Sequence, residues 1–243
     1  VHAGFAAGSP QARYLEHLGV PPERIFHPGS CVVDNAYWAD QAHRVREDGQ
    51  NVRERLGLPA HYFLCVARFL RCKNIPFLVK AYARYRQLSG DRPFGLVLCG
   101  SGVEEGRIAA AVQQTGAQDV HMTGFRQVDE LPAYYALADC FILPSSEFEC
   151  WGLVVNEAMA SGLPVLVSRM VGCAEDLAQE GHGDYTFDPT DEGGLAELML
   201  RISEDGATRT AMAAQSRRII EGHSPETAAS NFWRAVSAAQ SAC

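Results

Sequence analysis

The chain has 243 residues, 47% of them hydrophobic, which is enough apolar material for one large core or for one domain with an appendage. The formal net charge of -8 argues against nucleic acid as the main partner, because a surface that follows phosphates needs clustered Lys and Arg, and these are scattered here. No apolar run approaches the roughly 20 residues of a membrane span, and the chain begins at Val1 without a signal peptide or an initiator Met, so we expect a missing part upstream.

Residues 1–60 have the pattern of a domain end followed by a connection. The apolar spacing predicts a helix over Pro10–Leu18 and a short strand over Arg24–Phe26. A stretch with Pro and Gly follows, and then a polar, Arg-rich run that ends at Pro59. This pattern is typical of the last βα unit of a preceding domain with a linker after it.

From about residue 61 onward, apolar runs alternate with segments of helical period. The apolar runs predict six strands, over Phe63–Ala67, Gly95–Cys99, Val120–Thr123, Asp139–Leu143, Pro164–Ser168 and Tyr185–Phe187. The segments between them predict helices over Pro76–Leu88, Glu104–Gln114, Glu130–Leu137, Leu153–Ala160 and Ala174–Gln179. Near-continuous apolar strands that alternate with helices are typical of a parallel sheet covered on both faces. We therefore predict an α/β fold with a doubly wound, Rossmann-like parallel sheet.

The last part of the chain is helical. Residues 191–221 predict two more helices, and Ser224 begins a final helix that carries Phe232 and Trp233. We therefore predict four parts, namely the end of a truncated N-terminal domain, an interdomain linker, a ligand-binding domain and a C-terminal helix that returns toward the hinge, at 1–30, 31–60, 61–222 and 223–243.

The eight cysteines form no Cys-x-x-Cys pair and have no spacing of a zinc site. Several lie inside apolar runs, where free cysteine behaves as a small buried hydrophobe. Scattered unpaired thiols fit a reducing compartment. We predict a cytoplasmic protein whose contact with a membrane, if any, is peripheral and lies in the missing N-terminal domain.

The loop after the strand at Asp139–Leu143 has the residues of an anion site. In a parallel sheet, ligands bind outside the carboxyl ends of the strands, where loops run into helix N-termini. Gly152 permits close approach of the backbone, and the free N–H groups of the following turn can bind a diphosphate. Glu149 and Glu157 would face the same crevice at different depths. On spacing alone, the alternative carries more weight, in which Glu149 simply favours the helix N-terminus electrostatically and Glu157 lies on a solvated face.

Two neighbouring loops offer further ligand contacts. Arg68 and Lys73 follow the strand at Phe63–Ala67 and would supply the positive charge that phosphate oxygens require, unless they are simply solvated. Gly100 and Gly102 follow the next strand, where glycine turns allow a base or ribose to lie against the backbone. Gly-x-Gly by itself is a poor fingerprint, so this loop remains a weaker candidate.

Together these residues resemble the C-terminal domain of retaining glycosyltransferases with the GT-B fold, specifically glycosyltransferase family 4. The run from Glu149 to Glu157 is similar to the Glu-x7-Glu motif of that family, and the segments 67–74, 100–102 and 124–125 fall in the family's order. The resemblance covers roughly residues 20–235. Two departures concern the pocket, since this chain has Ala and Trp where many members have Gly and Phe.

The resemblance implies a role for each matching residue. Glu149 would contact hydroxyls of the transferred sugar, Glu157 would contact the ribose, and Arg68 and Lys73 would hold the diphosphate. Glu149, Arg68 and Lys73 are therefore the predicted catalytic residues. The other predicted donor contacts are main-chain or lining positions, with Arg126 and Gln127 beside the base: Gly100, Gly102, Arg126, Gln127, Trp151, Gly152, Leu153 and Val154.

The implied reaction is transfer of a hexosyl group, with retention, from a UDP-, GDP- or ADP-sugar to a saccharide or lipid-linked acceptor. Arg68, Lys73 and a helix N-terminus would stabilise the charge on the leaving diphosphate, so we expect neither a metal nor a cofactor. The sequence has no Asp-x-Asp, and its histidines are not paired for metal ligation. The acceptor site is expected mostly in the missing N-terminal domain.

Three alternatives remain open from the sequence, because a fold does not imply a function. One is a sugar-nucleotide epimerase on the same fold, which would need acid–base residues that we cannot assign. A second is a phosphorylase that uses pyridoxal phosphate, for which the chain offers only Lys73 and Lys80 as Schiff-base lysines. The third is a non-catalytic nucleotide-sugar-binding module.

Overall fold

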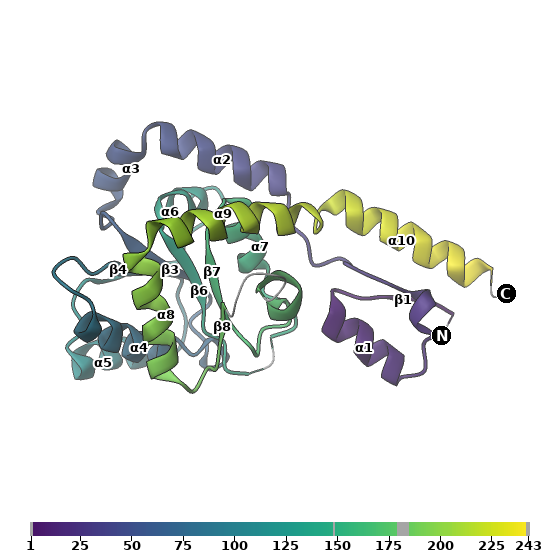
Figure 1. Ribbon diagram of the computed structural model, residues 1–243, viewed down its shortest axis with the longest axis horizontal. Helices are drawn as coiled ribbons and strands as arrows, with labels where there is room; N and C mark the ends of the chain where they lie inside the picture. The colour runs from purple at the N-terminus through teal and green to yellow at the C-terminus, as the bar shows by residue number, and fades with distance from the viewer. Residues whose placement is uncertain (1, 148, 179–184, 242–243) are drawn as a thin grey trace.

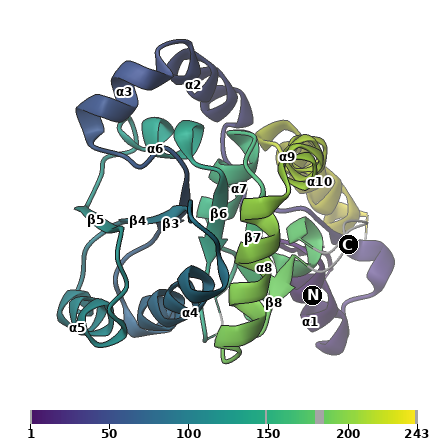
Figure 2. The same cartoon turned by 60° about the vertical axis from the view of Figure 1, so that its left-hand side comes forward.

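The computed structural model describes residues 2–147, 149–178 and 185–241, and its centre is a parallel sheet of six strands in the order β5-β4-β3-β6-β7-β8. Helices cover both faces of this sheet (Figure 1; Figure 2). The strands are β3 Tyr62–Val66, β4 Gly95–Cys99, β5 Val120–Gly124, β6 Cys140–Leu143, β7 Val165–Ser168 and β8 Thr186–Phe187. The predicted doubly wound α/β fold is confirmed, and each strand begins and ends within about a residue of its prediction.

Strand β3 shows why these segments read as continuous apolar runs. Its side chains alternate between two cores, with Tyr62, Leu64 and Val66 in one and Phe63 and Cys65 in the other. All five residues are buried, as expected for a central strand with helices on both sides. The two cores lie on opposite faces of the sheet and fix the helices that carry the loops at its carboxyl edge.

The helices divide between the two faces. On one face, α4 Ile75–Leu88, α5 Glu105–Thr115 and α8 Glu192–Glu204 bury their apolar sides in the core of Phe63. On the other face lie α6 Leu131–Leu137, α7 Leu153–Ala160 and α9 Gly206–Glu221. The segment predicted as helix Ala174–Gln179 forms a short π-helix over Ala174–Ala178, and Gln179 lies outside the described residues.

The stretch 31–60, expected to be an interdomain linker, contains two helices that the sequence did not predict. These are α2 Asn35–Glu47 and α3 Gly49–Leu56. Trp38 and Ala42 of α2 are buried, and the indole of Trp38 packs edge-on against a tyrosine of α6. Helix α2 has only a narrow apolar stripe, which the polar, Arg-rich composition of the whole segment does not reveal. Packing on α6 stabilises the helix.

Helix α2 begins at a side-chain cap whose removal should be measurable. The Asp34 carboxylate accepts a hydrogen bond from the amide of Tyr37 at 2.9 Å. We expect Asp34→Ala to lower the free energy of unfolding by about 1 kcal/mol, because an amide of the first turn loses its acceptor. Urea denaturation would measure it, with the exposed mid-helix Asp40→Ala as the control. Equal losses in both variants would show that the cap contributes nothing specific.

Residues 2–26 and the last helix lie to one side of the main sheet (Figure 1). Strands β1 Gly4–Phe5 and β2 Ile25–Phe26 pair in parallel around α1 Ser9–His17. Helix α10 Pro225–Gln240 packs on them, with the rings of Phe5 and Phe232 5.6 Å apart. None of the described helices is both long and apolar enough to cross a membrane.

Candidate functional site

The predicted ligand loops meet at the carboxyl edge of the sheet. Strand β3 lies between β4 and β6, so the chain changes direction across the sheet at the β3–β6 pair, where Phe63 and Leu64 lie beside Cys140 and Phe141. Loops that leave two such strands diverge and leave a crevice between them. The loop after β3 carries Arg68 and Lys73, and the loop after β6 carries Glu149. The sequence therefore places its main candidates at the switch point of the sheet.

Lys73 and Glu149 form an ion pair across this crevice. Their side chains are only 16% and 17% exposed, so neither is a solvated surface charge. The second oxygen of the Glu149 carboxylate accepts a hydrogen bond from the hydroxyl of Ser145, which is buried. Glu149 therefore does more than favour the N-terminus of α7 electrostatically. The carboxylate is held by a cation from one strand end and a hydroxyl from the next.

Arg68, from the same loop as Lys73, lines a cavity of about 310 Å³. No carboxylate among residues 2–147, 149–178 and 185–241 pairs with its guanidinium, which is free to bind an anion. Gly100, Arg126 and Val154, all predicted donor contacts, line the same cavity. Its walls are mostly apolar, and its lining comes from the ends of β3, β4 and β5 and from α6 and α7: Val66, Ala67, Arg68, Cys99, Gly100, Ser101, Phe125, Arg126, Leu131 and Val154.

The N-terminus of α7 opens onto the same edge of the sheet. Gly152 immediately precedes the helix with a φ of 98°, which is a conformation that favours glycine. A Cβ there would lie 2.8 Å from a methyl carbon of Val171, so a larger residue would not fit. The amides of Leu153 and Val154 donate to no acceptor within the described part of the chain. Two free N–H groups at a helix N-terminus suit an anion.

Glu157 lies deeper, on α7, and is partly buried. Its carboxylate accepts a hydrogen bond from the Tyr135 hydroxyl at 2.7 Å. Burial raises the pKa of Glu157, and the hydrogen bond from Tyr135 partly opposes that rise. Glu157 therefore does not lie on a solvated face, because its side chain is partly buried and bonded to Tyr135 of α6. The sequence did not identify Tyr135 or Ser145, since neither belongs to a local motif.

Three predicted donor residues lie differently from the rest. The indole of Trp151 is buried and donates its hydrogen bond to Asn156 at 2.8 Å, so its side chain faces the core and is not available to a ligand. The amide of Gln127 donates to Glu130, and the amide of Gly102 donates to Glu105. Neither Gln127 nor Gly102 lines the cavity. Both residues serve the start of the helix that follows them.

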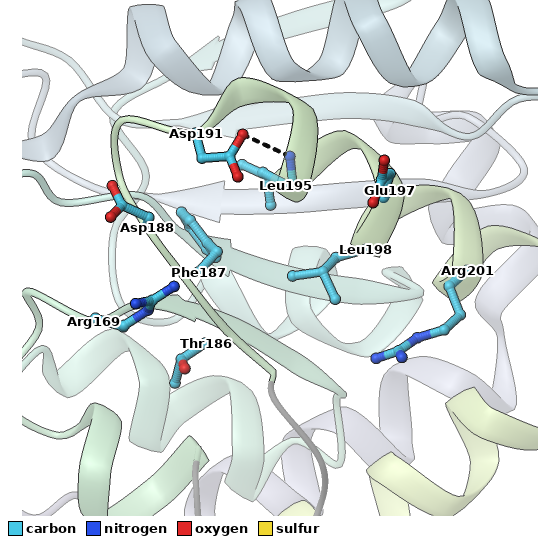
Figure 3. A pocket seen from close by; sticks show the side chains of 10 residues that line it. Arg169, Thr186, Phe187, Asp188, Asp191, Leu195, Glu197, Leu198 and Arg201 are labelled. Carbon is cyan, nitrogen blue, oxygen red and sulfur yellow. Dashed lines mark hydrogen bonds between the residues drawn. The ribbon is translucent and has the colours of Figure 1, made fainter.

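A second and larger cavity, of about 660 Å³, lies between β8 and α8 at the far edge of the sheet. Figure 3 shows Arg169 and Arg201 at its two ends, with Phe187 and Leu198 between them. Asp191 at its rim caps α8 by accepting from the amide of Gly194. None of the predicted site residues lines it. Its size alone would favour it as a binding site, but it lies at the far edge of the sheet, away from the β3–β6 switch point where Lys73 pairs with Glu149.

Metal ligands do not gather anywhere in the described ranges 2–147, 149–178 and 185–241. No group of three or more His, Cys, Asp or Glu side chains could hold an ion there. Arg68, Arg71 and Lys73 carry positive charge in the loop after β3.

Comparison with known proteins identifies relatives of this chain. The model of the family described as "Glycosyl transferases group 1" matches residues 50–219. The D-inositol 3-phosphate glycosyltransferase of Corynebacterium urealyticum is 30% identical over 192 residues, which are 76% of this chain and 43% of that protein. The mannosylfructose-phosphate synthase of Agrobacterium fabrum is 26% identical over 71% of this chain and 43% of its own length. The chain thus spans less than half the length of either relative.

Solved structures share the fold. Anabaena HepE in complex with UDP superposes with a TM-score of 0.78 at 19% identity, over 98% of this chain and 64% of that one. Sucrose-phosphate synthase from Thermosynechococcus elongatus superposes with a TM-score of 0.72 at 25% identity, over 98% of this chain and 58% of that one.

Proposed function

Because the chain belongs to the group 1 family of glycosyl transferases, we propose that it is the C-terminal, donor-binding domain of a retaining family 4 enzyme. The observation that carries the proposal is the Lys73–Glu149 pair across the β3–β6 switch point, where the loop of Lys73 also carries Arg68, which lines the smaller cavity. The relatives named above transfer or join sugars, and one structural neighbour was solved with UDP. The donor is a nucleotide sugar, with uridine, guanosine or adenosine as its nucleoside.

Each group in the crevice has a role in this proposal. The diphosphate lies between Arg68, Lys73 and the free amides at the start of α7, where three sources of positive charge converge. The base occupies the apolar cavity beside Arg126, and the ribose hydroxyls donate to Glu157. The Glu149 carboxylate accepts from hydroxyls of the transferred sugar. Lys73 is already paired with Glu149 in the absence of a ligand. A bound diphosphate would therefore share the lysine with Glu149, and the ammonium group is held in place before the diphosphate binds.

The reaction needs negative charge on the leaving diphosphate to be stabilised. Cleavage at the anomeric carbon passes through an oxocarbenium-like transition state while charge accumulates on the phosphate oxygens. Preorganised donors aimed at that charge each contribute about 3–4 kcal/mol. Arg68, Lys73 and the N-terminus of α7 supply them, and we propose that transfer proceeds without a metal ion. The hexosyl group passes to a saccharide or lipid-linked acceptor.

Calorimetry with uridine, guanosine and adenosine diphosphates tests this function directly. We expect one of them to bind, and Glu157→Gln to weaken that binding about tenfold, because hydrogen bonds to a charged acceptor contribute about 1.5–3 kcal/mol. Glu197→Gln is the matched control, since Glu197 lines the larger cavity on α8. The proposal fails if no diphosphate binds, or if both variants lose affinity equally.

A further inference from the structure

Tyr135 is a fully buried tyrosine whose hydroxyl points at a site residue. Its ring packs edge-on against Trp38 at 5.4 Å and against Phe141 at 5.9 Å, so its position is fixed from two sides. Its hydroxyl donates to the Glu157 carboxylate at 2.7 Å. A buried hydroxyl that lost this partner would be costly, so the geometry of the pair is specified by the core around it.

The pair lies one helical turn beyond the wall of the smaller cavity. Leu131 of α6 and Val154 of α7 line that cavity, and residues three or four positions further along share the same helix faces. Tyr135 follows Leu131 by four positions, and Glu157 follows Val154 by three. The same faces of α6 and α7 therefore carry first the cavity wall and then, one turn further on, the hydrogen bond between Tyr135 and Glu157.

The surroundings of Glu157 make a donor necessary. Burial raises the pKa of this carboxyl. Within the described chain, the Tyr135 hydroxyl is the group that lowers this pKa, through its hydrogen bond. Burial raises the pKa of Tyr135 well above its usual value, so its hydroxyl keeps its proton. The thiol of Cys99 on β4 lies in the same core as this tyrosine, and burial raises its pKa to about 12, so it stays neutral.

We infer that Tyr135 is a positioning residue, which holds Glu157 as a carboxylate turned toward the ribose hydroxyls of a bound nucleoside diphosphate. The inference rests on the proposed function. A carboxylate can accept from two hydroxyls at once, whereas a protonated carboxyl offers one acceptor fewer. Tyr135 thus acts on the ligand only through Glu157, and Trp38 of α2 holds the tyrosine ring in place.

The test compares Tyr135→Phe with the parent chain by calorimetry, using each nucleoside diphosphate and its 2′,3′-dideoxy counterpart. We expect Tyr135→Phe to weaken binding of the diphosphate about three- to tenfold, in line with one lost hydrogen bond, and to leave binding of the dideoxy form unchanged. Without the hydrogen bond from Tyr135, the pKa of Glu157 should rise. As the pH is lowered, the variant should therefore begin to lose affinity for the diphosphate at a higher pH than the parent does.

Tyr82→Phe is the control, because Tyr82 is also a buried tyrosine but lies on α4, where its hydroxyl bonds the carbonyl of Phe94. It should lose stability without any change in affinity. Equal losses of Tyr135→Phe for the diphosphate and the dideoxy form would overturn the inference, as would an unchanged pH profile. A parent chain that binds the diphosphate and its dideoxy form with equal affinity would overturn it too. A parent that binds no diphosphate would instead overturn the proposed function, and the inference with it.

Discussion

Replacing Lys73 by alanine should weaken binding of a nucleoside diphosphate about 10- to 100-fold. The lysine lies in the loop after β3, is largely shielded from solvent, and is held against Glu149 before any ligand arrives. A charge-assisted hydrogen bond from such a cation contributes about 1.5–3 kcal/mol, and 1.4 kcal/mol corresponds to a factor of ten. Calorimetry at fixed ionic strength measures the loss, and thermal unfolding checks that the variant still folds.

Lys80→Ala is the matched control for this prediction, because Lys80 is the other lysine of the chain. It lies on α4, is half exposed and pairs with Glu192 at a distance of 3.8 Å. Its loss should change affinity less than twofold, since an exposed pair contributes little. Comparable losses from both lysines would mean that net charge, not the crevice, attracts the diphosphate.

Replacing Gly100 by alanine should lower the free energy of unfolding by about 3–5 kcal/mol, through backbone strain and overpacking together. Gly100 has a φ of 147°, a conformation that L-residues rarely adopt. A Cβ at this position would lie 1.8 Å from the carbonyl oxygen of Ala67. Neither backbone can move freely, because the Gly100 amide bonds Gly124 and the Ala67 amide bonds Cys99. Urea denaturation measures the change.

Gly106→Ala provides the contrasting case, since Gly106 lies in α5 and an added Cβ there meets no neighbour within 4 Å. That variant should gain about 0.4–1 kcal/mol. If Gly100→Ala instead stays within about 1 kcal/mol of the parent, as most surface substitutions do, the loops after β3 and β4 are not closely packed. The expected loss would show that Gly100 is required for loop packing, whatever ligand it also touches.

The strands were the most predictable part of the molecule. Central strands such as β4 are buried on both faces, so their sequence is a continuous apolar run between turn residues, and the prediction of Gly95–Cys99 is exact. Helix α2 was missed because its polar composition masks the stripe of Trp38 and Ala42, and its stability comes from packing on α6. Composition averaged over a segment does not reveal such a stripe.

The candidate site was predictable only in part. Motif spacing and the rule for parallel sheets identified Arg68, Lys73 and Glu149, which the fold brings to one crevice. Tyr135 could not be identified, because its partnership with Glu157 depends on how α6 packs against α7, and no local period encodes that contact. The side-chain direction of Trp151 could not be predicted either. Trp151 lies inside the motif, but its indole is buried and donates to Asn156.

A crystal structure of the chain grown with a nucleoside diphosphate tests the central proposal most directly. The proposal predicts phosphates between Arg68, Lys73 and the first turn of α7, the ribose at Glu157, and the base in the cavity that Phe125 and Arg126 line. A diphosphate seated instead between Arg169 and Arg201, in the larger cavity beside α8, would contradict it.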